Sequence, residues 1–203
     1  MSSIKHPRGY FKYLLAADAE TSGLCFGSDN PVSNPKTGEH YQAVSFGLIV
    51  VDAETFQPVE DLYVEIQWNG KSNWTAGAEK IHGLSKDYLA KNGLTQEEAV
   101  VAIAELVLKY WGADGTISLI GQNVATFDLH FLRDLVRSQG IEFKFGNRHT
   151  DTHGLGHTVF GTYNSDDLFE LVGVVRKDHN SLEDAYASLK VVQVVRAMSD
   201  SFK

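Results

Sequence analysis

In the first third of the chain, apolar stretches alternate with turn-rich segments, a pattern that predicts β-strands. Strands are expected at residues 10–18, 42–51 and 62–68. Because strands joined by turn-rich segments tend to pair with their neighbours in the chain, we expect an antiparallel meander. The segment 27–40, between the first two strands, contains two prolines, two glycines and several Ser and Asn residues, which are typical of a long surface loop.

Helical spacing of apolar residues characterises the rest of the chain. Residues 95–111 carry apolar side chains at 99, 100, 103, 106, 107 and 110, and Thr95 and Glu98 have the spacing of a capping box. Four further elements are expected: helices at 127–138 and about 182–198, and short strands at 117–120 and 148–151. Strands first, followed by alternating helices and strands, predict an α/β sheet of mixed strand direction.

The size and composition of the chain are those of one globular domain. Its 203 residues, 43% of them hydrophobic, are enough for a substantial core, so we expect a single domain over residues 1–203. No apolar stretch is long enough to span a membrane, and the first residues lack the apolar block of a signal peptide. Cys25 is the single cysteine, which excludes an internal disulfide. We therefore expect a cytoplasmic protein with no membrane partner.

The net charge of −8 limits how the chain could bind nucleic acid. Proteins that grip long duplexes usually carry a basic surface and gain affinity from counterion release. This chain has no basic block. Contacts with nucleic acid would therefore have to be local, and they would depend on metal ions that offset the acidic side chains.

Asp18 and Glu20 stand two residues apart at the end of the first apolar stretch. Residues i and i+2 of a strand lie on the same face, so both carboxylates would project side by side where the strand leaves the sheet. Two anions at this spacing repel each other, and a divalent cation between them removes the repulsion. The ordinary alternative for an isolated pair of this kind is a turn acid followed by a solvated glutamate.

Three more polar side chains stand at the ends of predicted elements. Asp128 falls in the first turn of a helix, where an acid also complements the helix dipole. Asp184 has capping-box spacing from Ser181 and could be a structural acid, and His179 could be an ordinary loop histidine. Four acids and one histidine at element ends, where α/β folds place ligand sites, together predict a two-metal site.

The order and spacing of these residues resemble the three motifs of the DEDDh 3′→5′ exonucleases. The matching segments are Asp18-Ala-Glu-Thr-Ser-Gly-Leu24, Asn123-Val-Ala-Thr-Phe-Asp128 and His179-Asn-Ser-Leu-Glu-Asp184-Ala. Segments 81–84 and 150–152 are similar to secondary landmarks of the family, in the expected order. The second motif holds one residue more than its commonest form, and Ser181 replaces the usual alanine. We expect neither departure to abolish catalysis.

The resemblance implies a fold and an activity. The family, which includes RNase T, oligoribonuclease and the proofreading subunits of bacterial replicative polymerases, has an α/β, ribonuclease H-like fold: a mixed parallel and antiparallel five-stranded sheet flanked by helices. Its members release nucleoside 5′-monophosphates from the 3′ end of single-stranded DNA or RNA, including short oligonucleotides. A chain with these motifs is therefore expected to be a 3′→5′ exonuclease.

The resemblance also implies roles for the five side chains. By motif position, the ligands of two Mg²⁺ or Mn²⁺ ions would be Asp18, Glu20, Asp128 and Asp184. Asp18 would bridge the two ions, and His179 would take a proton from the attacking water. Because a histidine can accept protons near neutral pH, we predict a loss of activity on the acid side that disappears in His179→Ala.

Substrate contacts are implied in the same way. Thr21 and Leu24 follow the first acids, and in the family this segment and the His82 region line the pocket for the 3′ end. Leu24 could equally be a packing residue, and His82 a turn contact before Gly83. Phe127 is expected in the core, although an exposed ring could stack on a base.

A histidine-rich run offers a rival metal site. It consists of His149, Asp151, His153 and His157. The last two histidines, four residues apart, could face one way on a helix and bind Zn²⁺. Two glycines within that segment make a helix there unfavourable. The resemblance instead places Asp151 on a strand that leads into a packing helix.

Two other functions are compatible with the same residues. A non-catalytic or accessory module of the proofreading type would keep the fold and act through a polymerase or another partner. A small-molecule phosphohydrolase could use the same ions. The four carboxylates and His179 favour the nuclease, because a pure binder has no reason to hold mutually repelling acids together. A homodimer is also compatible with the sequence, since part of the family dimerises.

Overall fold

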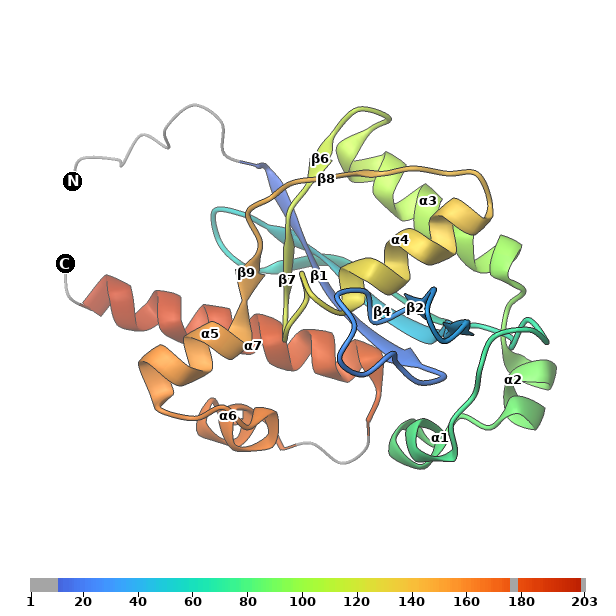
Figure 1. The fold of residues 1–203 in the computed structure, drawn as a ribbon. Coiled ribbons are helices and arrows are strands. Elements are labelled where there is room, and N and C mark those ends of the chain that lie inside the picture. Colours follow the sequence, from blue (N-terminus) through green and yellow to red (C-terminus); the bar gives the residue numbers. More distant parts are fainter. Residues whose placement is uncertain (1–10, 176–178, 202–203) are drawn as a thin grey trace.

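The structure is a computed structural model, and it describes residues 11–175 and 179–201 (Figure 1). The strands are β1 (Tyr13–Thr21), β2 (Ser33–Asn34), β3 (Glu39–His40), β4 (Ala43–Asp52), β5 (Pro58–Glu65), β6 (Thr116–Ile117), β7 (Leu119–Gly121), β8 (Lys144–Phe145) and β9 (Thr150–Asp151). The helices are α1 (Ala76–His82), α2 (Lys86–Asn92), α3 (Gln96–Trp111), α4 (Asp128–Ser138), α5 (Thr152–Leu155), the π-helical η1 (Gly156–Phe160), α6 (Ser165–Leu171) and α7 (Ser181–Ser201).

Five strands form the central sheet, in the order β5-β4-β1-β7-β9. β4 is antiparallel to both β1 and β5, whereas β7 is parallel to both β1 and β9. The predicted meander of the first three long strands is confirmed. The predicted mixed five-stranded sheet flanked by helices is also confirmed.

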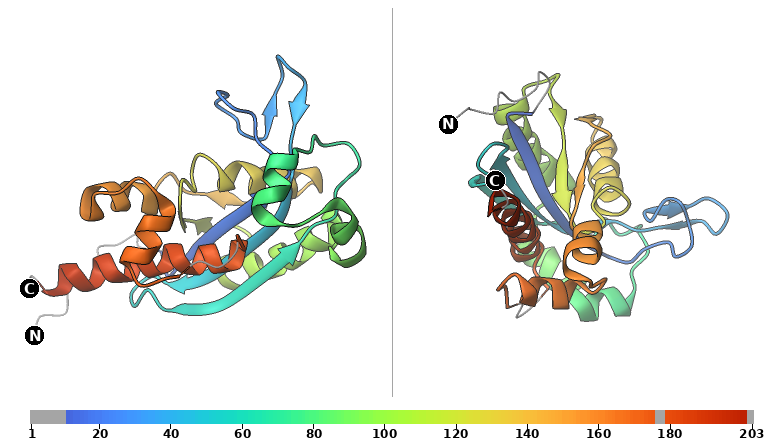
Figure 2. Two further views of the ribbon diagram at one scale, coloured as in Figure 1. Left: turned by 90° about the horizontal axis from the view of Figure 1, so that it is seen from below. Right: turned by 90° about the vertical axis from the view of Figure 1, so that its left-hand side faces the viewer.

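Helices cover both faces of the sheet, with α7 on one side and α3 and α4 on the other (Figure 2). Alternation along β1 divides its side chains between these faces. Leu15, Ala17 and Ala19 belong to the core that contains residues of α3 and α4, while Ala16 packs with residues of α7. Asp18 and Glu20 have the parity of Ala16, so they share the α7 face. None of the helices in the described ranges is long and apolar enough to cross a membrane.

Several boundaries differ from the predicted ones. β1 runs to Thr21, past both acids, because β4 pairs with it along that whole length. β5 begins at Pro58 rather than residue 62; its first residues are polar or exposed at the sheet edge, so no apolar pattern marks them. The strand expected at 117–120 is two short strands, because β6 pairs with β8 and β7 pairs with β1.

The predicted surface loop at 27–40 contains a hairpin, β2–β3, which projects from the body of the molecule (Figure 2). Its base is closed by hydrogen bonds from Cys25 N–H to the Pro31 carbonyl (2.8 Å) and from Tyr41 N–H to the Val32 carbonyl (2.8 Å). The residues on either side of the hairpin therefore stay next to the end of β1. The helix at 95–111 is confirmed as α3, with Thr95 and Glu98 forming both hydrogen bonds of the capping box.

Candidate active site

The edge of β1 beside its two acids is closed by a side chain rather than by a strand. β7 is short and pairs with β1 only at Leu15 and Ala16. Later N–H groups on that edge need other partners. Ala19 N–H donates to Oδ1 of Asp128, at the start of α4, over 2.8 Å. The Asp128 carboxyl is thereby fixed next to the residue that separates Asp18 from Glu20.

Asp128 is a buried acid with an unused oxygen. Its side chain is 2% exposed, and Oδ2 has no hydrogen-bond partner among the residues that the structure describes. Burial raises the pKa of Asp128 well above its ordinary value, and the negative charges of Glu20 and Asp151 act in the same direction. A cation bound at Oδ2 would satisfy this oxygen and favour the ionised carboxylate.

The first turn of α7 brings the third group of predicted residues to the sheet. The side chain of Asn180, not Ser181, caps the helix, accepting from Leu182 N–H (3.0 Å) and Glu183 N–H (3.2 Å). The predicted capping box from Ser181 to Asp184 is therefore wrong. Asp184 lies one residue beyond the N3 position, and its side chain is 3% exposed.

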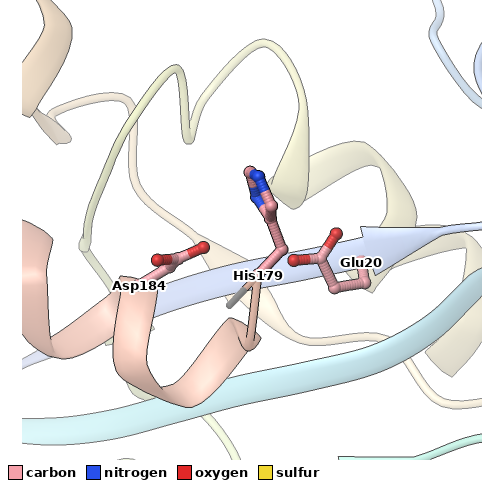
Figure 3. A group of neighbouring side chains, drawn as sticks. All are labelled: Glu20, His179 and Asp184. Atoms are coloured by element: carbon pink, nitrogen blue, oxygen red, sulfur yellow. The ribbon is translucent and has the colours of Figure 1, made fainter. Parts of the chain in front are cut away.

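Glu20, His179 and Asp184 converge at this point, although they come from opposite ends of the sequence. One ligand atom from each side chain lies within 4.8 Å of the other two. Figure 3 shows the carboxylates of Glu20, on β1, and Asp184, on α7, turned toward each other. Asp18 and Asp128 line one cavity at the same edge of the sheet. The structure thus brings all five predicted side chains into one region.

Two cavities open beside these acids. The larger, of about 670 Å³, lies between the end of β1 and α1, and Glu20 lines it together with all three predicted substrate residues, Thr21, Leu24 and His82. The smaller, of about 350 Å³, is lined by Asp18 and Asp128. Residues shared by both cavities are Ala19, Leu24, Phe26 and Phe127.

His82 presents an unused donor to the larger cavity. Its Nδ1 accepts from Leu84 N–H (3.0 Å), so the neutral ring carries its proton on Nε2. This atom is buried, and within residues 11–175 and 179–201 it has no partner in hydrogen-bonding geometry. Burial lowers the pKa of His82 and favours this neutral form. The turn contact that the sequence offered as an alternative is thus present, and it leaves Nε2–H available to a ligand.

Phe127 combines both predicted possibilities. It packs against the core and lies 5.0 Å from the Phe131 ring, yet it also lines both cavities.

The histidine-rich run is used structurally. His149 Nδ1 accepts from Leu119 N–H (3.0 Å), His153 pairs with the Gln122 amide (3.0 Å), and His157 stacks on Tyr163 with ring centroids 4.0 Å apart. Asp151 stands on β9 and caps α5, as the resemblance implied. In the described residues, none of these side chains belongs to a cluster of three or more metal-binding groups. The geometry thus gives the zinc alternative no support.

Sequence reasoning missed several residues that line the larger cavity. One of them is Phe26, which is 87% exposed. The sequence did hold a signal for it, since an aromatic residue two positions after the first motif is a candidate for contact with a base. Glu39 and Tyr41 reach the cavity from the end of the hairpin, and Thr75 from the cap of α1. No local pattern marks these three, because only the folded hairpin and α1 bring them to β1.

No family model and no curated protein sequence matches this chain. Solved structures do. E. coli Exonuclease I in complex with a dT13 oligonucleotide superimposes with a TM-score of 0.75 at 15% identity, over 94% of this chain and 42% of that one. The zinc-bound form of the E. coli Exonuclease I–ssDNA complex gives 0.72 at 15% identity, over 93% and 41%. The nuclease domain of 3′hExo, a DEDDh family member bound to rAMP, gives 0.66 at 14% identity, over 95% and 94%.

These matches define the fold. The chain has the ribonuclease H-like fold of the DEDDh exonucleases over more than nine tenths of its length. It spans about two fifths of Exonuclease I and nearly the whole of the 3′hExo nuclease domain.

Proposed function

We propose that this chain is a metal-dependent 3′→5′ exonuclease that releases nucleoside 5′-monophosphates from single-stranded nucleic acid. The observation that carries the proposal is the convergence of Glu20, His179 and Asp184 within 4.8 Å, in the fold of the DEDDh exonucleases. Glu20 comes from β1 and Asp184 from the first turn of α7, and two acids held this close repel each other unless a cation lies between them. The bound dT13 and rAMP of the similar proteins support a nucleic-acid substrate.

Divalent cations fit this donor set. The ligands would be Asp18, Glu20, Asp128 and Asp184, all hard oxygen donors suited to Mg²⁺ or Mn²⁺. Asp128 supports the fit most directly, since its Oδ2 is buried and unpartnered. When bound, two such ions would supply charge that activates water and stabilises the leaving oxygen.

The protein side chains would then divide the reaction between them. His179 would accept a proton from the water as the new oxygen–phosphorus bond forms, and its place beside Glu20 and Asp184 suits this role. The bond from phosphorus to the 3′ oxygen of the preceding nucleotide breaks, and that oxygen takes up a proton. The products are a nucleoside 5′-monophosphate and a strand one residue shorter.

The larger cavity would hold the 3′-terminal nucleotide. Glu20 and Glu39 both line it, and Leu24 and Phe26 would be apolar walls for a base. His82 Nε2–H would donate to an oxygen of that nucleotide, since Nδ1 already accepts from Leu84 N–H. Thr21 would place its backbone and hydroxyl beside the scissile phosphate.

Degradation of 5′-labelled DNA and RNA oligomers with Mg²⁺, Mn²⁺ or EDTA tests this proposal. We expect a ladder that shortens from the 3′ end only when metal is present. Asp184→Asn and His179→Ala should both reduce degradation to a trace at most. If His179→Ala keeps measurable activity, that activity should no longer decline at acid pH. His157→Ala is the matched control, since His157 stacks on Tyr163 outside the acid cluster.

The other functions predict different results. No cleavage of either nucleic acid under any metal condition would contradict the exonuclease and favour a non-catalytic module. Hydrolysis of small phosphate esters, with no attack on oligomers, would favour a phosphohydrolase. Comparing both sugars in one assay also measures the preference for DNA or RNA.

A further inference from the structure

Two small residues of β4 lie directly opposite the acids of β1. In the register of the antiparallel pair, Gly47 faces Asp18 and Ser45 faces Glu20. Residues opposite each other in such a pair share a face of the sheet, so Gly47 and Ser45 lie on the α7 face together with the two acids. We call Ser45 and Gly47 the α7 seat.

The first turn of α7 rests on this seat without an intervening side chain. A methyl group at Gly47 would lie 2.3 Å from both the nitrogen and the Cα of Leu182. Beside it, the hydroxyls of Ser45 and Ser181 are hydrogen-bonded over 2.9 Å, and both side chains are 0% exposed. The contact is thus made by helix backbone on strand backbone, and one buried hydrogen bond fixes it.

Farther along the same face of β4 the side chains are large. Ile49 and Val51 pack with Ala185, Leu189 and Val192 of α7, so a layer of side chains separates helix from strand there. The backbone approach at Gly47 is to the turn that carries Asp184. Small residues therefore stand where the helix must reach the acids, and large ones where it need only bury its apolar face.

We propose that the α7 seat is a positioning device, in which Gly47 and Ser45 set the place of Asp184 and His179 relative to Glu20. This inference rests on the proposed function, since the positioned groups are its candidate metal ligands and base. The first turn is internally tied by the Asn180 cap and by the bond from Asp184 N–H to the Asn180 carbonyl (2.9 Å). A shift of the turn on β4 would therefore carry Asp184 with it.

Gly47→Ala tests the seat. Because carbon atoms normally approach only to about 3.5 Å, the added methyl must move the turn or the strand by about 1 Å. A displacement of about 1 Å at a catalytic group can cost about 100-fold in rate, so we expect kcat to fall by about that factor while KM for an oligonucleotide changes less than about 3-fold. Mn²⁺ affinity, measured by calorimetry on the metal-free protein, should fall at least about 10-fold, because ligand distances tolerate only about 0.2 Å.

Gly154→Ala is the matched control. Gly154 lies in α5 without a left-handed backbone, and an added methyl would meet nothing within 4 Å. Both kcat and Mn²⁺ affinity should be unchanged. A folded Gly47→Ala protein with the kcat and Mn²⁺ affinity of the wild type would overturn the proposal.

Ser45→Ala keeps the test decisive should Gly47→Ala fail to fold. It adds no volume and removes the bond to Ser181, together with an interaction of the Ser45 hydroxyl with the Tyr63 side chain within the sheet. We therefore expect kcat and Mn²⁺ affinity to fall together by about 3- to 10-fold, the equivalent of about 0.7 to 1.4 kcal/mol. Wild-type values for both would count against the seat.

Calorimetry also separates this proposal from the proposed function. A wild type that binds Mn²⁺ through Asp184, loses that binding in Gly47→Ala and degrades no oligonucleotide would support the seat and contradict the exonuclease. If instead the wild type degrades oligonucleotides and both seat variants match its activity and its Mn²⁺ affinity, the exonuclease is supported and the α7 seat is contradicted.

Discussion

Asp128 shows how a single residue can be costly to the fold and useful to the site. Its carboxyl completes the edge of β1 through Ala19 N–H, but burial leaves Oδ2 without a partner and raises its pKa. The helix-dipole role that the sequence offered for this acid fits its place in the first turn of α4, whereas burial works against the ionised form.

The stability of the metal-free protein should reflect this cost. An unfolded Asp has a pKa of about 3.9. Because the pKa of Asp128 is raised in the folded state, the folded protein binds more protons than the unfolded chain just above that pH, and this group's contribution to stability is lost as pH rises. Asp128→Asn keeps the Oδ1 acceptor without the charge. In EDTA we expect a higher Tm than the wild type near about pH 8, with a difference that shrinks toward about pH 4.

Differential scanning calorimetry of both proteins between these two pH values checks this prediction, and Asn at exposed Asp29 is the control that should leave the pH dependence unchanged. The variant should bind Mn²⁺ poorly and have little activity, so stability and function would move in opposite directions. An Asp128→Asn protein no more stable than the wild type at the higher pH would contradict the argument.

Phe26 allows a second prediction about one side chain. Because it is 87% exposed, Phe26→Ala should change the free energy of unfolding by no more than about 0.5 kcal/mol. Stacking of a base on an aromatic ring contributes about 1 to 3 kcal/mol, so KM for an oligonucleotide should rise by about 10-fold if a substrate base lies on this ring. Steady-state kinetics with dT oligomers measures the effect. Leu171→Ala, at an exposed apolar residue that lines neither cavity, should leave KM unchanged.

At the scale of elements, the long strands and helices were the predictable part of the fold. β4 is a continuous apolar stretch and α3 and α4 have helical apolar spacing, and the boundaries of all three lie within about a residue of the predicted ones. The helices α1, α2 and α6 were not predicted, because each is only seven residues long and is set by its cap and by tertiary contacts. The larger cavity uses α1, so its far wall could not be derived from periodicity.

The contact between α7 and β4 makes a further prediction, about stability alone. Ser181→Ala removes the Ser181 partner of the buried Ser45 hydroxyl, which keeps its interaction with the Tyr63 side chain, and the loss should cost about 0.5 to 1.5 kcal/mol. The double variant Ser45→Ala/Ser181→Ala removes both hydroxyls and should recover most of that loss. Urea unfolding of the four proteins measures the coupling; single and double variants whose losses simply add would show that the two hydroxyls do not interact. Ser181, expected to differ little in effect from the family's alanine, is thus hydrogen-bonded to Ser45 on β4.

For the whole molecule, the sequence predicted the site better than its surroundings. The three motifs located Glu20, His179 and Asp184, which the structure brings within 4.8 Å, and Asp18 and Asp128, which line one cavity, because a metal site would constrain residue types strongly at fixed places in a fold. The residues that complete the cavities, such as Glu39 and Tyr41, depend on how the β2–β3 hairpin returns to the body. Their position follows from tertiary structure, so no short pattern encodes it.

The net charge of −8 makes the last prediction, which concerns affinity for nucleic acid. An acidic protein gains little from counterion release, so substrate affinity should come from the metal ions and the cavities rather than from a basic surface groove.

Fluorescence anisotropy with labelled dT oligomers and the His179→Ala variant, which should bind without cleaving, tests this idea. Affinity should fall at least about 10-fold in EDTA, and the slope of log K against log salt should be no steeper than about −2, the value for about three phosphate contacts with a single strand. Oligomers of about 4 and about 20 nucleotides should bind with affinities within about 3-fold of each other. The longer one would bind more tightly if the protein had an extended single-strand path, which typically covers up to about 16 nucleotides. Tight binding in EDTA that strengthens with oligomer length would instead reveal a basic path that the composition of this chain gives no reason to expect.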